Sequence, residues 1–428
     1  MNSTPTLLNP NILSLRESAT LAINQTAKKL RSKGETVYHW GFGQSPFEVP
    51  QSIQDALKKA SHHKEYLPTL GLLELREAIS DFYHQQYGYS FHPDHILIGP
   101  GSKELIFQAL FILEGPLLIP APSWVSYGPQ AQIRGKKVVP IQTQEKHGYK
   151  LQPEEFLETC KKLESESQKV LIINNPNNPT GSVYTDLEIQ KISKICKEHN
   201  VIVISDEIYA LCDFSGREYQ GFSRYCPERT IVTGGLSKGL SAGGYRLGFL
   251  AAPGSMASVV KTLCAMVSET FSAVSAPIQY AAIPGFQNNK DIREYAQVCT
   301  SIHQVMGEYF HTRFTDMGLT CPLPEGAFYL FPNFEPFRQK LASIGIYNSN
   351  QLCHALLKSC RIAVLPASDF YCPNEMLAVR VATVDYNGAN VFKSALQANS
   401  LDSAFVEKHC PQIKKGCDSL ELFLKSLE

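Results

Sequence analysis

Between about residue 90 and residue 250, short apolar runs rich in β-branched residues alternate with segments of helical periodicity. The apolar runs include Ile96–Gly99, Val170–Ile173 and Val201–Ser205. Strands that alternate with helices in this way pair in parallel, and the connecting helices cover both faces of the sheet. The alternation therefore predicts an α/β fold with a mostly parallel sheet between helices. After Met256 the pattern is helical as far as about Phe286.

Five of the predicted strands are followed by a residue that could carry chemistry. These residues are Ser102, Trp124, Asn178, Asp206 and Lys238. In open α/β sheets, ligands bind outside the carboxyl ends of the strands. Each residue also has a plainer interpretation, since Asp206 could cap a helix and Trp124 could fill a core. Their repeated position at strand ends favours one shared ligand site.

One of them, Lys238, lies in a run of small residues that extends from Gly234 to Gly248. Small neighbours let a flat ligand approach the backbone, and burial or nearby cations help a lysine to lose its proton. A neutral amine forms Schiff bases with carbonyl compounds. Ser237 and Arg246 are suited to bind an anion. The alternative is a glycine-rich surface loop, but lysine plus phosphate site is what pyridoxal 5′-phosphate (PLP) requires.

Two glycine turns offer backbone to a ligand. The strand Ile96–Gly99 leads through Gly101 into a helix that begins near Ser102, and the first amides of such a helix attract anions. Gly43 lies in a loop after a short predicted strand. A plain turn is the alternative for each.

Composition excludes several classes of partner. The 428 residues contain 40 Lys and Arg against 40 Asp and Glu, which gives no electrostatic case for nucleic acid or a membrane surface. No apolar run reaches the roughly 18 residues of a transmembrane helix, and the N-terminus lacks the apolar core of a signal peptide. The 12 cysteines are scattered without a CxxC pair, which predicts reduced, buried thiols in a cytoplasmic protein and no metal site.

Three motifs give the chain a resemblance to a known family over nearly its whole length. The stretch from Ser237-Lys238 to Gly248 fits the lysine signature of the PLP-dependent aminotransferases of fold type I, class I/II. Residues 174–181 resemble that family's Asn-Pro-x-Asn-Pro-Thr-Gly loop, and residues 66–79 resemble its Tyr-x4-Gly-x3-Leu-Arg-x-Ala-Ile element. Residues 18–50 are most similar to the bacterial aspartate/prephenate branch of the family.

Two segments depart from the family pattern without removing a group that the chemistry needs. Gln44-Ser45-Pro46-Phe47 stands where many relatives have Glu-Pro-Asp-Phe, and Tyr245 stands where tryptophan commonly precedes the arginine. The resemblance implies a large PLP-binding domain with a seven-stranded type of sheet and a smaller α+β domain. We expect an N-terminal arm with part of the small domain at 1–45, the large domain at 46–295 and the small domain at 296–428.

The resemblance implies a role for each residue around the cofactor ring. Lys238 would bind PLP as a Schiff base and move the proton at the substrate Cα. Asp206 would keep the pyridine nitrogen protonated, because a nearby carboxylate favours the cation. Asn178 and Tyr209 would hydrogen-bond the phenolic oxygen, and Trp124 would stack on the ring.

It also implies groups for the phosphate and for the substrate carboxylate. The phosphate would be bound by Ser102, Lys103, Ser237 and Arg246. In relatives, the tyrosine that matches Tyr66 reaches the phosphate of the cofactor in the neighbouring subunit. The resemblance therefore implies a homodimer with shared active sites. Arg380 would hold the substrate α-carboxylate as a fork, with the Gly43 amide and Asn178 nearby.

Two further basic residues bear on the choice of substrate. Arg16 and Lys103 stand where relatives of the aspartate/prephenate branch place cations near the side-chain carboxylate of acidic substrates. A second buried carboxylate needs such a partner. Alternatively, Arg16 is a solvated residue of the N-terminal arm and Lys103 contributes only its backbone amide.

We therefore expect a PLP-dependent aminotransferase that moves an amino group from an L-amino acid to a 2-oxo acid by a ping-pong reaction. Aspartate and glutamate are the candidate donors, with an aromatic or alanine type as the alternative. The alternative is a lyase on the same fold, such as a cysteine-S-conjugate β-lyase or an aminocyclopropane-carboxylate synthase. Such an enzyme would share nearly all of the residues that bind the cofactor and the substrate. A PLP-fold binding protein without activity would lack the lysine, the aspartate or the carboxylate arginine, and this sequence has all three.

Overall fold

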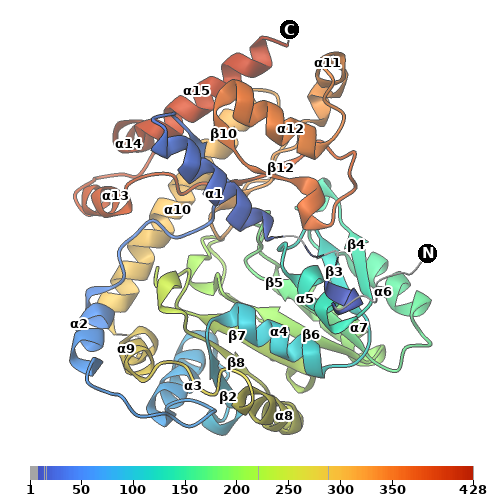
Figure 1. The fold of residues 1–428 in the computed structure, drawn as a ribbon, viewed down its shortest axis with the longest axis vertical. Coiled ribbons are helices and arrows are strands. Elements are labelled where there is room, and N and C mark those ends of the chain that lie inside the picture. Colours follow the sequence, from blue (N-terminus) through green and yellow to red (C-terminus); the bar gives the residue numbers. More distant parts are fainter. Residues whose placement is uncertain (1–7, 14, 16, 220, 288, 428) are drawn as a thin grey trace.

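The computed structural model describes residues 8–13, 15, 17–219, 221–287 and 289–427 of the chain. A large sheet flanked by helices forms one part of the molecule, and small sheets with their own helices form the other (Figure 1). Among the described residues, no helix is both long and apolar enough to cross a membrane.

The large sheet has seven strands in the order β2-β8-β7-β6-β5-β3-β4. In chain order they are β2 (Ile96–Gly99), β3 (Leu117–Ala121), β4 (Val138–Gln142), β5 (Lys169–Asn174), β6 (Val201–Asp206), β7 (Thr230–Gly235) and β8 (Gly248–Ala251). Of these seven strands, β8 alone runs antiparallel to its neighbours, β2 and β7, and the other pairs are parallel. The predicted α/β fold with a mostly parallel sheet is confirmed.

Helices cover both faces of this sheet. One face carries α4 (Ser102–Ile112), α5 (Tyr127–Arg134) and α8 (Ala257–Ser268). The other carries α3 (Leu73–Tyr87), α6 (Pro153–Lys162), α7 (Asp186–Glu198) and α9 (Ala276–Phe286), with α2 (Gln51–Ala60) against α9. Successive strand residues point to opposite faces, so Ile172 and Ile204 pack with the first set of helices, whereas Leu171 and Val203 pack with the second.

The expected continuous helical stretch from Met256 to Phe286 is wrong. The structure has two helices, α8 and α9, separated by residues 269–275, where Ser272 has a φ of +59°. The two helices contribute to hydrophobic clusters on opposite faces of the sheet. A single helix could not serve both faces, because the chain has to pass around the edge of the sheet between them.

The smaller part of the molecule combines a segment near the start of the chain, which includes residues 19–39, with residues 290–427. Its strands are β1 (Tyr38–His39), β9 (Tyr329–Leu330), β10 (Ile362–Ala363), β11 (Leu365–Pro366) and β12 (Val379–Ala382), which form a β1-β10 pair and a β11-β12-β9 sheet. Its helices are α1 (Ala19–Ser32), α10 (Lys290–Asp316), α11 (Arg338–Ser343), α12 (Ser349–Ala355), α13 (Gly388–Ala395), α14 (Ser403–His409) and α15 (Pro411–Lys425). Trp40 and Phe310 are buried in its core. This arrangement places the segment after β1 opposite the carboxyl ends of the large sheet.

Candidate active site

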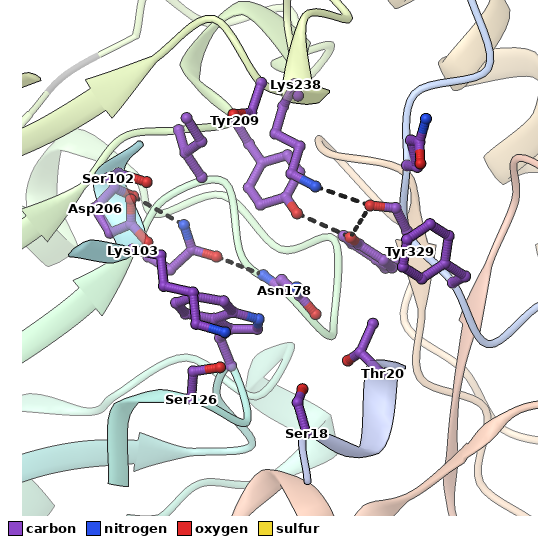
Figure 2. A pocket seen from close by; sticks show the side chains of 18 of the residues that line it. Ser18, Thr20, Ser102, Lys103, Ser126, Asn178, Asp206, Tyr209, Lys238 and Tyr329 are labelled. Atoms are coloured by element: carbon purple, nitrogen blue, oxygen red, sulfur yellow. Dashed lines mark hydrogen bonds between the residues drawn. The ribbon is translucent and has the colours of Figure 1, made fainter. Parts of the chain in front are cut away.

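A cavity of ≈ 380 Å³ opens at the carboxyl ends of the central strands. Among the residues that line it are the predicted site residues Gly43, Ser102, Lys103, Trp124, Asn178, Asp206, Tyr209, Ser237, Lys238, Arg246 and Arg380. Figure 2 shows several of these side chains around the same space. The structure therefore brings together predicted residues that are separated by more than half of the sequence.

Asp206 lies at the end of β6, the central strand of the large sheet. Its side chain is buried, and it accepts hydrogen bonds from the Tyr127 hydroxyl at 2.6 Å and from the Thr233 hydroxyl at 3.3 Å. Burial raises the pKa of Asp206 to about 6, although both hydroxyls oppose the shift. The carboxylate is thus poised to pair with a cationic group in the cavity.

Lys238 follows β7 and extends into the cavity. Its Nζ donates a hydrogen bond to the Gly43 carbonyl at 2.8 Å and lies 5.8 Å from the ring centroids of both Tyr209 and Phe328. Burial lowers the pKa of Lys238 to about 8, and the positive charge of Arg380 contributes to this shift. A substantial fraction of the amine is therefore neutral near pH 8, as a nucleophile or a general base requires.

An anion site lies where α4 begins. Gly101 precedes the helix with a φ of +92°, and a Cβ on it would lie 2.5 Å from Arg246 Nη2. Arg246 Nη2 donates to the Pro100 carbonyl at 3.0 Å, which holds the guanidinium beside the helix N-terminus. Ser102, the first helical residue, and Ser237 line the same cavity. Helix N-terminal amides, a guanidinium and hydroxyls together suit a phosphate group.

Arg380 lies on β12 and is buried. Its guanidinium donates to the Gly41 carbonyl at 2.6 Å and to Asn178 Oδ1 at 3.3 Å, whereas its buried Nε has no hydrogen-bond partner among the described residues. Its Cζ lies 4.8 Å from the centroid of the Tyr329 ring and 5.3 Å from that of the Phe370 ring. A cation that is fixed on two aromatic faces and keeps a spare donor is suited to bind a carboxylate.

Two tyrosines of this site were not singled out from the sequence. The Tyr329 hydroxyl lies 2.8 Å from the Tyr209 hydroxyl (Figure 2). A Cβ on Gly43 would lie 1.9 Å from the Tyr329 oxygen, so only glycine fits beside Tyr329 in this position. Tyr127 holds the Asp206 carboxylate. Tyr127 follows Trp124 by three positions, and this nearness to a predicted site residue is the sequence signal that points to Tyr127. Tyr329 reaches the site only through the strand pairing of the smaller sheet.

Trp124 lines the cavity and is only half-buried, so it is not the enclosed core residue of the plainer interpretation. Its ring packs edge-on against Tyr127 at 5.2 Å, and Lys103 Nζ lies 5.5 Å from its centroid. Burial lowers the pKa of Lys103, and the charge of Arg246 adds to the shift. The side chain of Lys103, and not only its amide, thus belongs to the cavity wall.

Tyr66, the residue expected to act across a subunit boundary, does not line this cavity. It lies between α2 and α3, and 98% of its surface is exposed. Arg16, the other predicted site residue still to be placed, lies outside the described residues.

The groups that line the cavity fit PLP. PLP has an aldehyde, a ring nitrogen, a flat ring face and a phosphate, and the wall offers Lys238, Asp206, Trp124 and the α4 anion site for these in turn. The Gly101 backbone leaves the space that Arg246 needs at the phosphate end. The donor set thus matches each polar part of this cofactor.

Comparison with known proteins agrees with this fit. The profile of the family "Aminotransferase class I and II" matches residues 35–392. The chain is 32% identical over 386 residues to an aspartate aminotransferase of Geobacillus stearothermophilus, covering 88% of this chain and 95% of that protein. It is 31% identical over 367 residues to a probable aspartate/prephenate aminotransferase of Aquifex aeolicus, covering 84% and 90%.

A solved structure confirms the predicted fold type I. The aspartate aminotransferase of Thermus thermophilus with maleate superposes with a TM-score of 0.84 at 23% identity, covering 97% of this chain and 99% of that one. At this identity the likeness concerns the fold alone. With the matches in sequence, the chain belongs to the class I and II aminotransferase family and is a PLP-dependent transaminase.

Proposed function

We propose that this transaminase uses an acidic L-amino acid, aspartate or glutamate, as its donor and transfers the amino group to a 2-oxo acid. The observation that carries the proposal is that one cavity holds the Lys238 amine, the buried Arg380 and a second cation, Lys103. Two cations suit a substrate with two carboxylates. The names of the relatives from Geobacillus and Aquifex support acidic donors, and the relatives give no support to the lyase alternative.

The residues that line the cavity would have different roles in the reaction. When bound, PLP supplies an electron-poor ring that accepts the electron pair left at the substrate Cα. Lys238 would bind the cofactor and carry the proton to and from Cα, and Asp206 would pair with the ring nitrogen. Arg380, with the amide of Gly43, would fix the α-carboxylate so that the Cα proton faces the lysine amine.

Around the cofactor, the other predicted residues would complete the site. Asn178 and Tyr209 would hydrogen-bond the phenolic oxygen of the ring, and Trp124 would cover one ring face. The phosphate would be bound by Ser102, Ser237, Arg246 and the amide of Lys103. The hydroxyl of Tyr329 fixes that of Tyr209 at 2.8 Å and so limits the rotation of this ligand.

The proposed donor is tested by the Lys103→Met variant. Methionine keeps the unbranched apolar stem, so the change removes the charge and little of the packing. We expect kcat/KM for aspartate to fall roughly 30- to 150-fold, the scale of one lost charge-assisted contact of about 2–3 kcal/mol. Alanine, which has no distal carboxylate, should lose far less. Rates with both donors are measured against 2-oxoglutarate.

Arg16→Ala is the parallel variant for the second predicted cation, and its effect on aspartate and alanine should differ in the same sense. If either variant lowers kcat/KM equally for aspartate and alanine, the replaced residue does not bind the distal carboxylate. If the wild-type protein prefers alanine or phenylalanine to aspartate, the acidic donor itself is wrong.

We also propose a homodimer in which Tyr66 completes the neighbouring active site. An aromatic side chain with 98% of its surface exposed supports this placement. Mixed dimers of Tyr66→Phe and Lys238→Ala subunits provide the test. If Tyr66 acts across the interface, one site of each mixed dimer lacks both residues and the other is intact. Activity should therefore exceed that of both parent proteins.

Separately purified parents, mixed without reassociation, are the control for this measurement. If mixed dimers are shown to form but activity does not rise, Tyr66 does not act across the interface and contributes only to its own subunit.

We further propose the domain division 1–45, 46–295 and 296–428 and a cytoplasmic location. The seven-stranded sheet lies within residues 96–251, and the pairing of β1 with β10 joins the first segment to the last. Helix α10 runs across the boundary at residue 295 and would connect the two domains. All 12 cysteines lie among the described residues, and none of them forms a disulfide, which supports a reducing compartment.

A further inference from the structure

Three hydroxyl groups link the loop that carries Gly43 to the segment that carries Lys238. Ser45 Oγ lies 2.6 Å from Ser241 Oγ, and the Tyr295 hydroxyl lies 2.7 Å from the same Ser241 oxygen. We call Ser45, Ser241 and Tyr295 the hydroxyl triad. None of its members is among the residues that line the cavity. Any role in the reaction must therefore act through the residues that do.

The hydrogen bonds of the hydroxyl triad have one consistent direction. The Tyr295 hydroxyl also lies 2.7 Å from the Glu48 carbonyl oxygen, which can only accept. If Tyr295 donates its single proton to this carbonyl, Ser241 donates to Tyr295 and Ser45 donates to Ser241. Hydrogen bonds in such a series polarise one another, so the loss of one hydroxyl weakens the others.

The inner end of the hydroxyl triad acts on the lysine segment. The amide of Ser241 donates to the Lys238 carbonyl at 3.3 Å, and Ser241 has a φ of +57°. A non-glycine residue in this left-handed region is strained, and its side-chain hydrogen bonds to Ser45 and Tyr295 hold it there. The lysine segment is thus fixed three residues beyond the reactive amine.

The outer end acts on the loop. Gly43, two residues before Ser45, accepts the hydrogen bond from Lys238 Nζ at 2.8 Å. The loop and the lysine segment are therefore tied at two points, once through Gly43 and Lys238 and once through Ser45 and Ser241. In the protein without cofactor, the two ties together set the distance between the Gly43 backbone and the amine.

Helix α13 supports the loop from the other side. The Phe392 ring lies 5.5 Å from the Tyr295 ring and 6.1 Å from the Phe47 ring. A Cβ on Gly388 would lie 2.0 Å from the Pro46 carbonyl oxygen, so the helix begins directly against the loop.

We propose that the hydroxyl triad is a positioning device that holds the Gly43 backbone against Lys238 and so presents the Gly43 amide to the carboxylate of the donor. The part that concerns the carboxylate rests on the proposed function. Breaking the hydroxyl triad removes the tie between Ser45 and Ser241, but it removes neither the amine of Lys238 nor the guanidinium of Arg380 from the site. Substrate binding should therefore suffer more than the chemical step.

Kinetics of Tyr295→Phe, Ser45→Ala and the double variant test the proposal. Phenylalanine keeps the ring contact with Phe392 and removes only the hydroxyl. Each single variant should raise KM for the amino donor roughly three- to tenfold, the scale of one net hydrogen bond, with kcat nearly unchanged. The double variant should be no worse than the worse single one, because the hydroxyl triad acts as a unit.

Tyr184→Phe is the matched control, since Tyr184 is buried and its hydroxyl accepts from the Leu151 amide at 2.9 Å, away from the cavity. It should lose stability without a change in KM. Additive effects in the double variant, or a fall in kcat equal to the rise in KM, would overturn the proposal.

Hydrogen exchange on the cofactor-free protein gives a readout that does not depend on activity. In Tyr295→Phe the amides of residues 41–48 should exchange faster than in the wild type and in Tyr184→Phe. Unchanged exchange would overturn the positioning role. Faster exchange in a protein that does not use acidic donors would instead count against the proposed function and leave the hydroxyl triad intact.

Discussion

Replacing Lys238 with alanine should reduce transamination by at least about 100-fold, because a positioned general base alone contributes on that scale. The substitution removes a buried amine that has a lowered pKa and lies within hydrogen-bond distance of the Gly43 backbone. The remaining wall of the cavity, which includes Asp206 and Arg246, keeps its contacts. The variant should therefore lose amine transfer to 2-oxoglutarate but still retain PLP after desalting. Absorbance of the desalted protein measures the retained cofactor.

Lys169→Met is a matched control for this result. Lys169 is a buried lysine outside the cavity. Its Nζ donates to the carbonyls of Glu166 and His199 at the amino ends of β5 and β6. Its replacement should lower stability and leave the rate per folded molecule unchanged. A Lys238→Ala protein with activity within about tenfold of the wild type would reject the assigned role, since a general base is worth more than that.

Asp206→Asn should cost about 100-fold or more in kcat, a loss typical of removing one preorganised electrostatic contact in a site that excludes water. The amide has nearly the same shape but carries no charge, so it cannot favour a protonated ring nitrogen. It also presents an NH₂ group to the hydroxyls of Tyr127 and Thr233, one of which has to reorient.

The pH dependence of cofactor binding gives a second signature of Asp206. Burial raises the pKa of this carboxyl to about 6 in the free protein, so the charged form prevails above pH 6 and the neutral form below it. Affinity for PLP in the wild type should fall as the pH drops through about 6. The asparagine variant should bind PLP weakly and without this transition.

The neighbouring Glu207 provides the control. It is equally buried, and burial raises its pKa to about 7, but it accepts hydrogen bonds from Ser205 and Tyr83 and does not line the cavity. Glu207→Gln should leave kcat and the transition near pH 6 close to those of the wild type. Equal losses in both variants would show that general damage to the sheet, and not the charge of Asp206, is responsible.

The sequence alone determined the features that depend on neighbours along the chain. Alternating strands and helices predict a doubly covered sheet, because a buried parallel strand has to be apolar on both faces. The polar residues at strand ends meet at one edge for the same topological reason, which is why the order of residues along the chain is enough to assign Asn178, Asp206 and Lys238 to one site. The glycine-rich setting of Lys238 is local as well.

The tertiary structure decided what depends on contacts between distant segments. Whether one helix or two follows Met256 depends on which face of the sheet is still open. Tyr329 joins the site through strand pairing in the smaller sheet, and Ser45 meets Ser241, which lies 196 positions further along the chain. Such pairs leave no periodic signal in the sequence, since only packing of the whole chain brings their side chains within hydrogen-bond distance.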